Sequence, residues 1–161
     1  MSRLQFSWHE ESPPAYLPTK QVYGFCFDHR GKCLLLEEPG ERYTLPGGKP
    51  EGAEIHEETL EREVFEEATV LIEDVAIFGY QLVLGDDTCN DGQPYAQVRA
   101  IARIAGFLFA RPDPATGIAY RRLLHSLGTV EKLLGWGTIG SAQCHAARRH
   151  AQKRFPELNL E

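Results

Sequence analysis

The sequence predicts an α/β fold, and three observations carry that prediction. Runs rich in β-branched and aromatic residues recur at strand length, the clearest being 21–28 and 70–84. A helix-forming stretch rich in glutamate, leucine and alanine, residues 55–68, separates them, and a second helical segment ends the chain. With 161 residues, of which 42% are hydrophobic, the chain is expected to form one domain, 1–161, with an ordinary core.

The first half of the chain begins with an arm and a hairpin. Residues 1–20 contain three prolines and little periodicity, which predicts an arm lying over the domain. Residues 21–28 (QVYGFCFD) and 32–38 (KCLLLEE) are β-rich runs separated by His-Arg-Gly, which predicts a hairpin. After a short extended piece, 42–45, Pro46-Gly47-Gly48 predicts a loop in which glycine permits close backbone approaches.

The helix expected over 55–68 has acidic residues toward its N-terminus, where the helix dipole favours them. Residues 70–84 then predict a long strand, and 85–94 a polar loop. In the extended segment 95–110, alternation places Gln97, Arg99, Ile101 and Arg103 on one face.

The last third of the chain continues with a proline-rich turn at 111–117. A strand near 120–126 and a short helix near 130–134 should follow. A final helix, 141–155, is expected to begin at Ser141 as N-cap and to end before Pro156.

Negative charge is concentrated on one element. Seven of the 23 acidic residues lie between Glu54 and Glu67 with a single base, Arg62, which gives this segment a net charge of −6. The whole protein also has a net charge of −6, so 16 acids balance 16 bases elsewhere. This distribution argues against general nucleic-acid binding, which needs a basic surface to neutralise phosphates.

Helical spacing sorts these acids onto two faces. Glu63, Glu66 and Glu67 share one side, which we assign to a cleft, and the set 57/58/61 gathers on the opposite side, which we assign to water. A glutamate run is more often only a solvated face. Like charges three or four apart nevertheless destabilise a helix, and a bound divalent cation would remove that cost. Side chains that offer only oxygen ligands suit Mg²⁺ or Mn²⁺, and these ions favour substrates that contribute phosphate oxygens.

A sequence pattern around this helix resembles the Nudix hydrolase signature. It consists of Gly48, five residues, Glu54, seven residues, and then 62–70 (REVFEEATV). The signature covers 23 residues and departs from the family at Thr69, where the family has glycine. A β-branched residue ends a helix in the left-handed conformation only at a cost. Either the helix ends differently here, or mild strain is tolerated.

The resemblance implies an α/β/α sandwich with a mixed β-sheet between helices. It also implies hydrolysis of a pyrophosphate bond in a nucleoside diphosphate linked to another group, by attack of water at phosphorus, with Mg²⁺ or Mn²⁺ as cofactor. By this resemblance, Glu63, Glu66 and Glu67 bind the metal together with the Gly47 carbonyl, and Glu63 also orients or deprotonates the water. Arg62 holds these carboxylates in place. Gly48 belongs to the loop, and Glu54 supports the loop or an outer metal ion.

Substrate-binding candidates outside the signature rest on weaker signals. Arg99 and Arg103, or the later pair Arg121 and Arg122, could hold phosphates through their guanidinium groups, although a structural ion pair is the commoner role for any one arginine. Trp136 is a candidate to stack on a base, although packing is the commoner role.

Two further motifs are set aside. The glycines of 135–140 match a dinucleotide-binding pattern, but a helical segment precedes them where that fold needs a strand, so we interpret the motif as a turn between helices. The loop 86–92 resembles a calcium loop but lacks the required ligands. A minority interpretation lets Asp86 or Asp87 reach the metal cleft.

The remaining features of the sequence limit where the protein is located and what it binds. Apolar runs are only a few residues long, the N-terminus lacks a signal-peptide pattern, and four cysteines are widely spaced, so we expect a cytoplasmic protein with reduced thiols and no membrane partner. The expected partner is a small nucleotide derivative rather than a nucleic acid polymer, and the sequence also allows a homodimer. The competing function is a non-catalytic Nudix-fold module that binds or senses a nucleotide.

Overall fold

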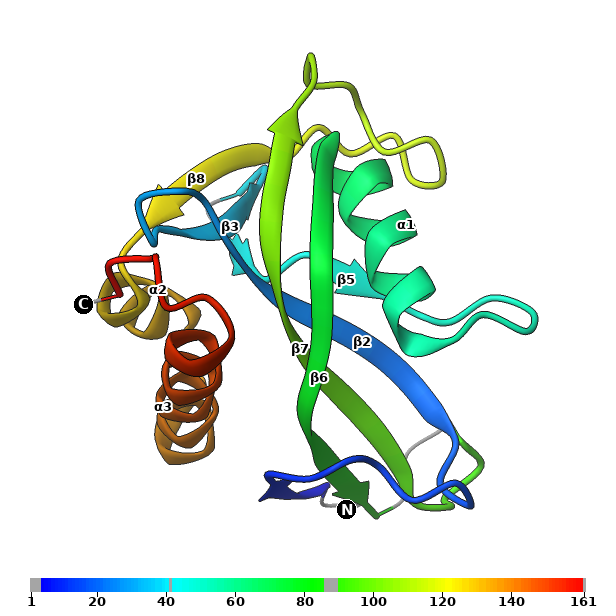
Figure 1. Ribbon diagram of the computed structural model, residues 1–161. Helices are drawn as coiled ribbons and strands as arrows, with labels where there is room; N and C mark the ends of the chain where they lie inside the picture. Colours follow the sequence, from blue (N-terminus) through cyan, green and yellow to red (C-terminus); the bar gives the residue numbers. More distant parts are fainter. Residues whose placement is uncertain (1–3, 41, 86–89, 161) are drawn as a thin grey trace.

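The structure is a computed structural model that describes residues 4–40, 42–85 and 90–160. Within these residues one sheet has strand order β1-β6-β7-β2-β3-β4, with β5 paired to β2 and β8 paired to β3 (Figure 1). The strands are β1 (Gln5–His9), β2 (Thr19–Phe27), β3 (Cys33–Glu38), β4 (Arg42–Thr44), β5 (Gly47–Gly48), β6 (Val70–Leu84), β7 (Tyr95–Phe107) and β8 (Arg121–His125). The helices are α1 (His56–Ala68), α2 (Leu127–Leu134) and α3 (Gly137–Arg154).

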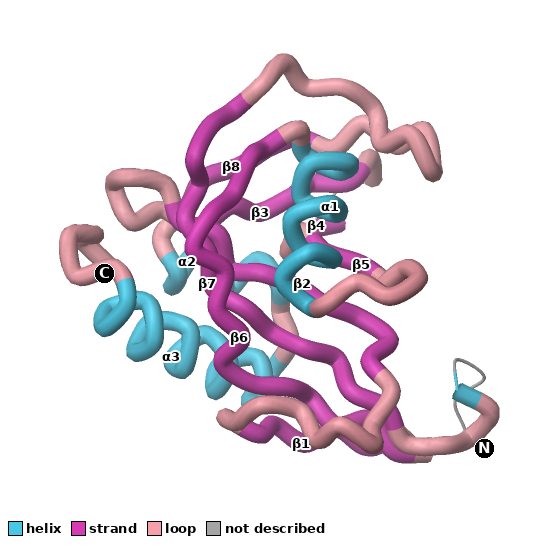
Figure 2. The backbone as a smooth tube through the Cα atoms, turned by 45° about the vertical axis from the view of Figure 1, so that its right-hand side comes forward, coloured by secondary structure: helices cyan, strands magenta, loops and turns pink. Residues whose placement is uncertain are grey.

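The sheet is mixed and lies between helices. Strands β2 and β7 pair in parallel, whereas the β6–β7, β1–β6, β2–β3 and β3–β8 pairs are antiparallel. Helix α1 covers one face, and α2 and α3 cover the other (Figures 1 and 2). The predicted α/β fold with a mixed sheet between helices is therefore confirmed.

Alternation along β2 builds a core on each face of the sheet. Val22 and Cys26 point into a cluster with Leu60 and Val64 of α1, and all four side chains are fully buried. Phe25 and Phe27 point the other way, into a cluster that includes Ala147 of α3. The two faces of one strand thus hold helices from opposite sides, as expected when successive side chains alternate.

Three elements differ from the sequence predictions. The first is the predicted loop at Pro46-Gly47-Gly48, whose two glycines pair with β2 and form strand β5. The segment expected as an arm contributes β1, which pairs with the end of β6 from Gln5↔Leu84 to His9↔Tyr80 (Figure 2). Helix α3 begins at Gly137, before the predicted N-cap Ser141, because Trp136 packs across the first turn. A Cβ atom on Gly140 would lie only 2.4 Å from Cβ of Trp136, so this glycine leaves room for the N-cap residue of its own helix.

The end of α1 resolves the question raised by Thr69. This residue adopts the left-handed conformation, with φ 53° and ψ 44°, and its N–H donates to the Phe65 carbonyl at 2.9 Å. Its own carbonyl accepts from Leu108 N–H at 3.0 Å, and its hydroxyl accepts from Arg111 N–H at 3.3 Å. The helix therefore ends in the left-handed conformation that glycine favours, and these hydrogen bonds offset the strain of a β-branched residue there.

In the described part of the chain, none of the helices combines the length and the apolar character that a bilayer crossing requires. The three described cysteines, Cys26, Cys33 and Cys144, are buried free thiols.

Candidate active site

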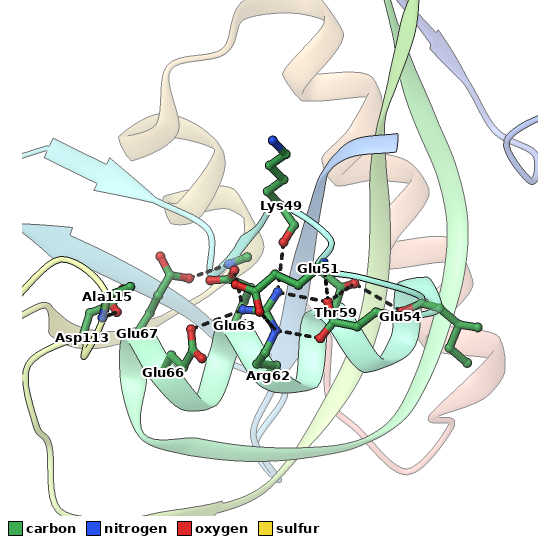
Figure 3. Close-up of polar contacts among 12 residues, drawn as sticks. Lys49, Glu51, Glu54, Thr59, Arg62, Glu63, Glu66, Glu67, Asp113 and Ala115 are labelled. Carbon is green, nitrogen blue, oxygen red and sulfur yellow. Dashed lines mark hydrogen bonds and ion pairs between the residues drawn. The ribbon is translucent and has the colours of Figure 1, made fainter. Parts of the chain in front are cut away.

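Arg62 is the centre of a hydrogen-bonded cluster on the side of α1 that carries Glu63 and Glu66 (Figure 3). Its Nε donates to Glu54 Oε2 at 2.7 Å. Its Nη1 donates to Glu63 Oε1 at 2.9 Å and to Glu66 Oε2 at 3.3 Å. The remaining nitrogen, Nη2, donates to the Lys49 carbonyl at 2.9 Å, so one guanidinium fixes the helix carboxylates against the preceding loop.

Glu54 anchors the loop that leads into α1. Besides Arg62, its carboxylate accepts from Glu51 N–H at 2.8 Å and from the Thr59 hydroxyl at 3.0 Å. The hydrogen bond from Arg62, the largest cause, lowers the pKa of Glu54 to about 2. Glu54 is thus engaged entirely within the protein, in a position suited to supporting the loop.

Glu63 fits against the loop glycine that precedes it in the signature. A Cβ atom on Gly48 would lie 2.5 Å from Glu63 Cδ, so any larger residue at position 48 would displace this carboxylate. Burial raises the pKa of Glu63 above its usual value, and the neighbouring Arg62 only partly opposes that rise. The carboxylate is therefore held in a place that disfavours its charge.

Glu67 is the most buried acid of the helix, with 9% of its surface exposed. Its Oε1 accepts from the Gly47 N–H at 2.8 Å. Burial, the largest cause, raises the pKa of Glu67 to about 8, and the charges of Glu63, Asp113 and Glu66 add to the effect. The structure thus joins Gly47 to Glu67 through the glycine N–H, whereas the family resemblance assigned the carbonyl of Gly47 a role at the metal.

A fourth acid, Asp113, reaches this cluster from the turn between β7 and β8 (Figure 3). It is 5% exposed, and its Oδ1 accepts from Ala115 N–H at 2.8 Å. Its charge contributes to the raised pKa of both Glu63 and Glu67. Sequence reasoning missed Asp113 because only the tertiary fold brings it to α1, and its one local signal was an acid inside a proline-rich turn.

The opposite side of α1 carries the acids assigned to water. Glu58 and Glu61 are exposed and Glu57 is half-buried. Glu58 Oε1 accepts from the Ile55 N–H at 3.0 Å and so caps the helix N-terminus. These acids have structural or solvated roles on a separate face from the cluster.

The donor chemistry of the cluster fits a divalent cation. Within the described residues, no group of three or more acidic, histidine or cysteine side chains is arranged to hold a metal ion. The carboxylates are instead turned toward Arg62 and the Gly47 N–H. Even so, four acids share one site, two of them have raised pKa values, and all offer oxygen, which is the donor set that Mg²⁺ and Mn²⁺ prefer. Binding a cation requires these side chains to turn from their present partners.

A second feature is a pocket of about 430 Å³ on the face of the sheet that carries α3. Its lining side chains are polar or aromatic for the most part: Phe6, Gln21, Tyr23, Arg42, Tyr43, Thr44, Gln81, Gln97, Arg99, Trp136 and Ile139. The volume falls in the range of small-molecule sites, about 300–1,000 Å³. Two predicted substrate-binding residues, Arg99 and Trp136, therefore lie together in one pocket.

Arg99 carries a buried positive charge in this pocket. It is 3% exposed, and among the described residues no carboxylate lies within 4.0 Å of its guanidinium. The guanidinium carbon instead lies 5.1 Å from the ring centre of Tyr23 and 5.3 Å from that of Trp136. Burial lowers the pKa of Arg99 to about 10.

Arg103, the other predicted substrate-binding arginine, does not line this pocket. Although it shares a strand face with Arg99, it pairs with Asp74 at 3.4 Å and with Glu157, and its guanidinium lies over the Phe155 ring. Arg122 donates to the carbonyls of Ala68 and Leu108. Both arginines are therefore engaged by groups of the protein, as is commoner for this residue type. The acids proposed as a minority alternative, Asp86 and Asp87, lie outside the described residues.

Strand β5 joins the pocket to the carboxylate cluster. A Cβ atom on Gly47 would lie 2.5 Å from Tyr23 Cδ1, which lines the pocket, whereas the position next to it, Gly48, touches Glu63. Gly47 also has φ 149°, a backbone conformation that favours glycine. Two consecutive glycines thus separate a buried positive charge from a partly buried negative cluster.

Comparison with known proteins identifies the family of this chain. Residues 17–123, more than half of the chain, match the NUDIX domain. The chain belongs to the Nudix hydrolase family. No curated protein sequence matches it.

Solved Nudix structures have the same fold. A mutant of the Bacillus subtilis pyrophosphohydrolase BsRppH is 25% identical, with a TM-score of 0.58, covering 74% of this chain and 70% of that one. A Nudix hydrolase from Nitrosomonas europaea is 22% identical, with a TM-score of 0.59, covering 90% and 97%. An ADP-ribose pyrophosphatase from Streptococcus suis is 22% identical, with a TM-score of 0.54, covering 88% and 94%. The family, the fold and the class of enzyme predicted from the sequence are confirmed.

Proposed function

We propose that this Nudix protein hydrolyses a pyrophosphate bond in a nucleoside diphosphate derivative, by attack of water at phosphorus, with Mg²⁺ or Mn²⁺ as cofactor. The observation that carries the proposal is the carboxylate cluster, in which Arg62 holds Glu63 and Glu66 and the Gly47 N–H holds the buried Glu67. The name of the Bacillus subtilis relative, a pyrophosphohydrolase, supports the same reaction class.

Each residue of the cluster has a definite task in this proposal. Glu63, Glu66 and Glu67 hold the cation, and Asp113 adds a fourth carboxylate from the opposite loop. Glu63, which is partly buried beside the glycine loop, orients the attacking water and accepts its proton. When bound, the cation neutralises phosphate oxygens and makes water a better nucleophile.

Arg62 and Glu54 act as positioning residues. Arg62 contacts two of the three proposed ligands and is itself held by Glu54, so it keeps the carboxylates in register with the loop. The Gly47 N–H performs the same task for Glu67, and Gly48 leaves the space that Glu63 needs. Such supporting contacts are typically worth about 10- to 100-fold in metal affinity or activity.

The nucleoside part of the substrate is assigned to the pocket that contains Arg99 and Trp136. The two glycines of β5 lie between this pocket, next to Tyr23, and the carboxylate cluster, next to Glu63, and we propose that the phosphate chain of the substrate passes this strand. A nucleotide derivative combines a planar base with a phosphate chain, which matches an aromatic pocket beside a cation site. We place the activity in the cytoplasm, which the buried free thiols support. The homodimer stays a prediction.

A substrate panel tests the proposal. The full chain is incubated with Mg²⁺ or Mn²⁺ and nucleoside triphosphates, nucleotide sugars, ADP-ribose, dinucleotides or dinucleoside polyphosphates, and phosphorus-containing products are quantified. Glu66→Gln and Glu67→Gln should abolish turnover, whereas Glu61→Gln, the same change on the exposed face of the same helix, should leave it intact. Absence of turnover above the two inactive variants on every substrate would contradict the enzyme and favour a binding module.

A further inference from the structure

The pocket that contains Arg99 is organised by a directional chain of hydrogen bonds. Arg99 Nε donates to Gln143 Oε1 at 2.9 Å, and Gln143 Nε2 donates to Gln81 Oε1 at 3.0 Å. Gln81 Nε2 then donates to Gln97 Oε1 at 2.6 Å. On its other side, Arg99 Nη1 donates to Gln21 Oε1 at 2.9 Å.

The direction of this chain is imposed by the arginine. A guanidinium can only donate hydrogen bonds, so Gln143 and Gln21 must each turn their amide oxygen toward it. Because Gln143 is fully buried and has its oxygen occupied, it can only donate onward, and the same constraint passes through Gln81 to Gln97. The arginine therefore determines the orientation of each amide in the hydrogen-bond chain.

The chain ends in hydrogen-bond donors at the pocket. The amide oxygens of Gln97 and Gln21 are both engaged, so their amide nitrogens are the outer ends of the hydrogen-bond chain. Among the described residues, neither nitrogen has an acceptor. Both residues line the pocket, as does Arg99 with its positive charge. The amide nitrogens of Gln97 and Gln21 are thus donors beside the Arg99 guanidinium, whose charge lacks a protein carboxylate within 4.0 Å among the described residues.

We propose that this pocket selects a nucleobase whose recognised edge carries carbonyl oxygens, such as a 6-oxopurine or a 2,4-dioxopyrimidine, over an amino base such as adenine or cytosine. An exocyclic oxygen accepts from Gln97, Gln21 or Arg99, whereas an exocyclic amino group at the same place sets donor against donor. Tyr23 and Trp136, whose rings are inclined by 26°, supply flat surfaces for the base. The inference rests on the proposed function, because it names the substrate class of that site.

Matched pairs of mononucleotides test this selection separately from catalysis. Binding of IMP, AMP, UMP and CMP to the full chain is measured by calorimetry in EDTA, where no hydrolysis is required. Since the phosphate is common to all four, the ratio within each pair reports the base alone. IMP should bind at least about 10-fold more tightly than AMP, and UMP than CMP, as expected for one or two discriminating hydrogen bonds.

Replacing the donor at one end of the hydrogen-bond chain with an acceptor gives a second test. In Gln97→Glu, one carboxylate oxygen still accepts from Gln81, and the other offers an acceptor to the pocket in place of a donor. The preference within each pair should then reverse, and Gln21→Glu provides an independent variant with the same logic should the first fold poorly. Gln152→Glu, an identical change at an exposed position of α3, should leave both ratios as in the wild type.

Several results would overturn the inference. Equal binding within both pairs would mean that the pocket takes the phosphate or reads shape alone, and undetectable binding of all four would mean that it takes no nucleotide. Ratios unchanged by Gln97→Glu and Gln21→Glu would remove the glutamines from recognition. Hydrolysis of substrates irrespective of base would overturn the inference while the proposed function stands, and base-selective binding without turnover would do the reverse.

Discussion

Buried charges in proteins are usually paired with an opposite charge, but two regions on either side of β5 are exceptions, one with negative and one with positive charge. The carboxylate cluster buries more negative charge than Arg62 neutralises, and the pocket buries the positive charge of Arg99 with no described carboxylate within reach. Elsewhere the rule holds: Arg103, four residues along the same strand, pairs with Asp74 and Glu157. Because an unpaired buried charge is costly, such groups persist where a ligand supplies the missing partner.

The contrast also assigns different ligand chemistry to each side. The carboxylates of the cluster offer oxygen acceptors, which suit a cation, whereas Arg99, Gln97 and Gln21 of the pocket offer donors, which suit acceptors on a ligand. In the proposed function, a nucleotide with a metal-bound phosphate chain would satisfy both. Glycines at 47 and 48 allow the two regions to lie within a single strand of each other.

The largest expected effect comes from filling the space between the regions. In Gly48→Ala the new Cβ would lie 2.5 Å from Glu63 Cδ, so this carboxylate must move. A displacement of about 1 Å can cost about 100-fold in rate, and we expect kcat/KM to fall by about that factor. Gly128→Ala, at a site where an added Cβ meets nothing within 4 Å, should keep wild-type kcat/KM. Equal activity in both variants would separate Glu63 from catalysis.

A smaller effect is expected when the guanidinium group of Arg99 is replaced. Arg99→Lys keeps a cationic group but loses the planar geometry that serves Gln143 and Gln21 together. The preference for IMP over AMP should fall from about 10-fold to about 2-fold or less in calorimetry. Arg103→Lys makes the same change on the same strand face outside the pocket and should keep the wild-type preference. Loss of preference in both variants would point to a general effect on the sheet.

The pH dependence of thermal stability should distinguish the apo and metal-bound protein. Because the folded pKa of Glu67 is raised from 4.5 to about 8, its contribution is most favourable below pH 4.5 and is lost as the pH rises toward 8. A bound cation offsets that loss. The gain in Tm on adding Mg²⁺ should therefore be several degrees larger at pH 8 than at pH 5 in scanning calorimetry. Glu61→Gln should follow the wild type, and a gain independent of pH would contradict the link to Glu67.

The smallest expected effect comes from a paired surface charge. Glu10 accepts from Arg149 at 2.7 and 2.8 Å and from His150 at 2.9 Å, and the Arg149 hydrogen bonds lower the pKa of Glu10 to about 2. Its contribution is present above pH 4.5 and is lost as the pH falls toward 2. Because the pair is solvent-exposed, Glu10→Gln should lower Tm at pH 7 by only about 2 °C or less. A larger fall would mean that this contact holds β1 in place.

Local patterns predicted the elements that local chemistry determines. The strand over 70–84 and the helix over 56–68 follow from composition and periodicity, and the acids of the signature are set by helical spacing. Strand β1 was missed because its pairing with β6 depends on tertiary contact. The start of α3 was missed because glycines at 137 and 140 hide a helical turn that Trp136 packs against.

The site was predictable to the same extent. The cluster on α1 was visible because its members lie within one helix and the adjoining loop. Asp113 and the glutamine chain were invisible, since residues 21, 81, 97 and 143 meet only when β2, β6, β7 and α3 assemble. Arg99 and Arg103 look equivalent in the sequence, and only their surroundings in the fold separate a pocket residue from an ion pair.

Direct titration of Mn²⁺ into the protein tests the central claim, that the buried charge of the α1 cluster is completed by a cation. Calorimetry at pH 8 on the wild type, Glu67→Gln and Glu61→Gln compares the buried acid with an exposed acid of the same helix. We predict that Glu61→Gln binds Mn²⁺ as the wild type does and that Glu67→Gln binds at least about 10-fold more weakly. Equal Mn²⁺ affinity in all three proteins would contradict the account.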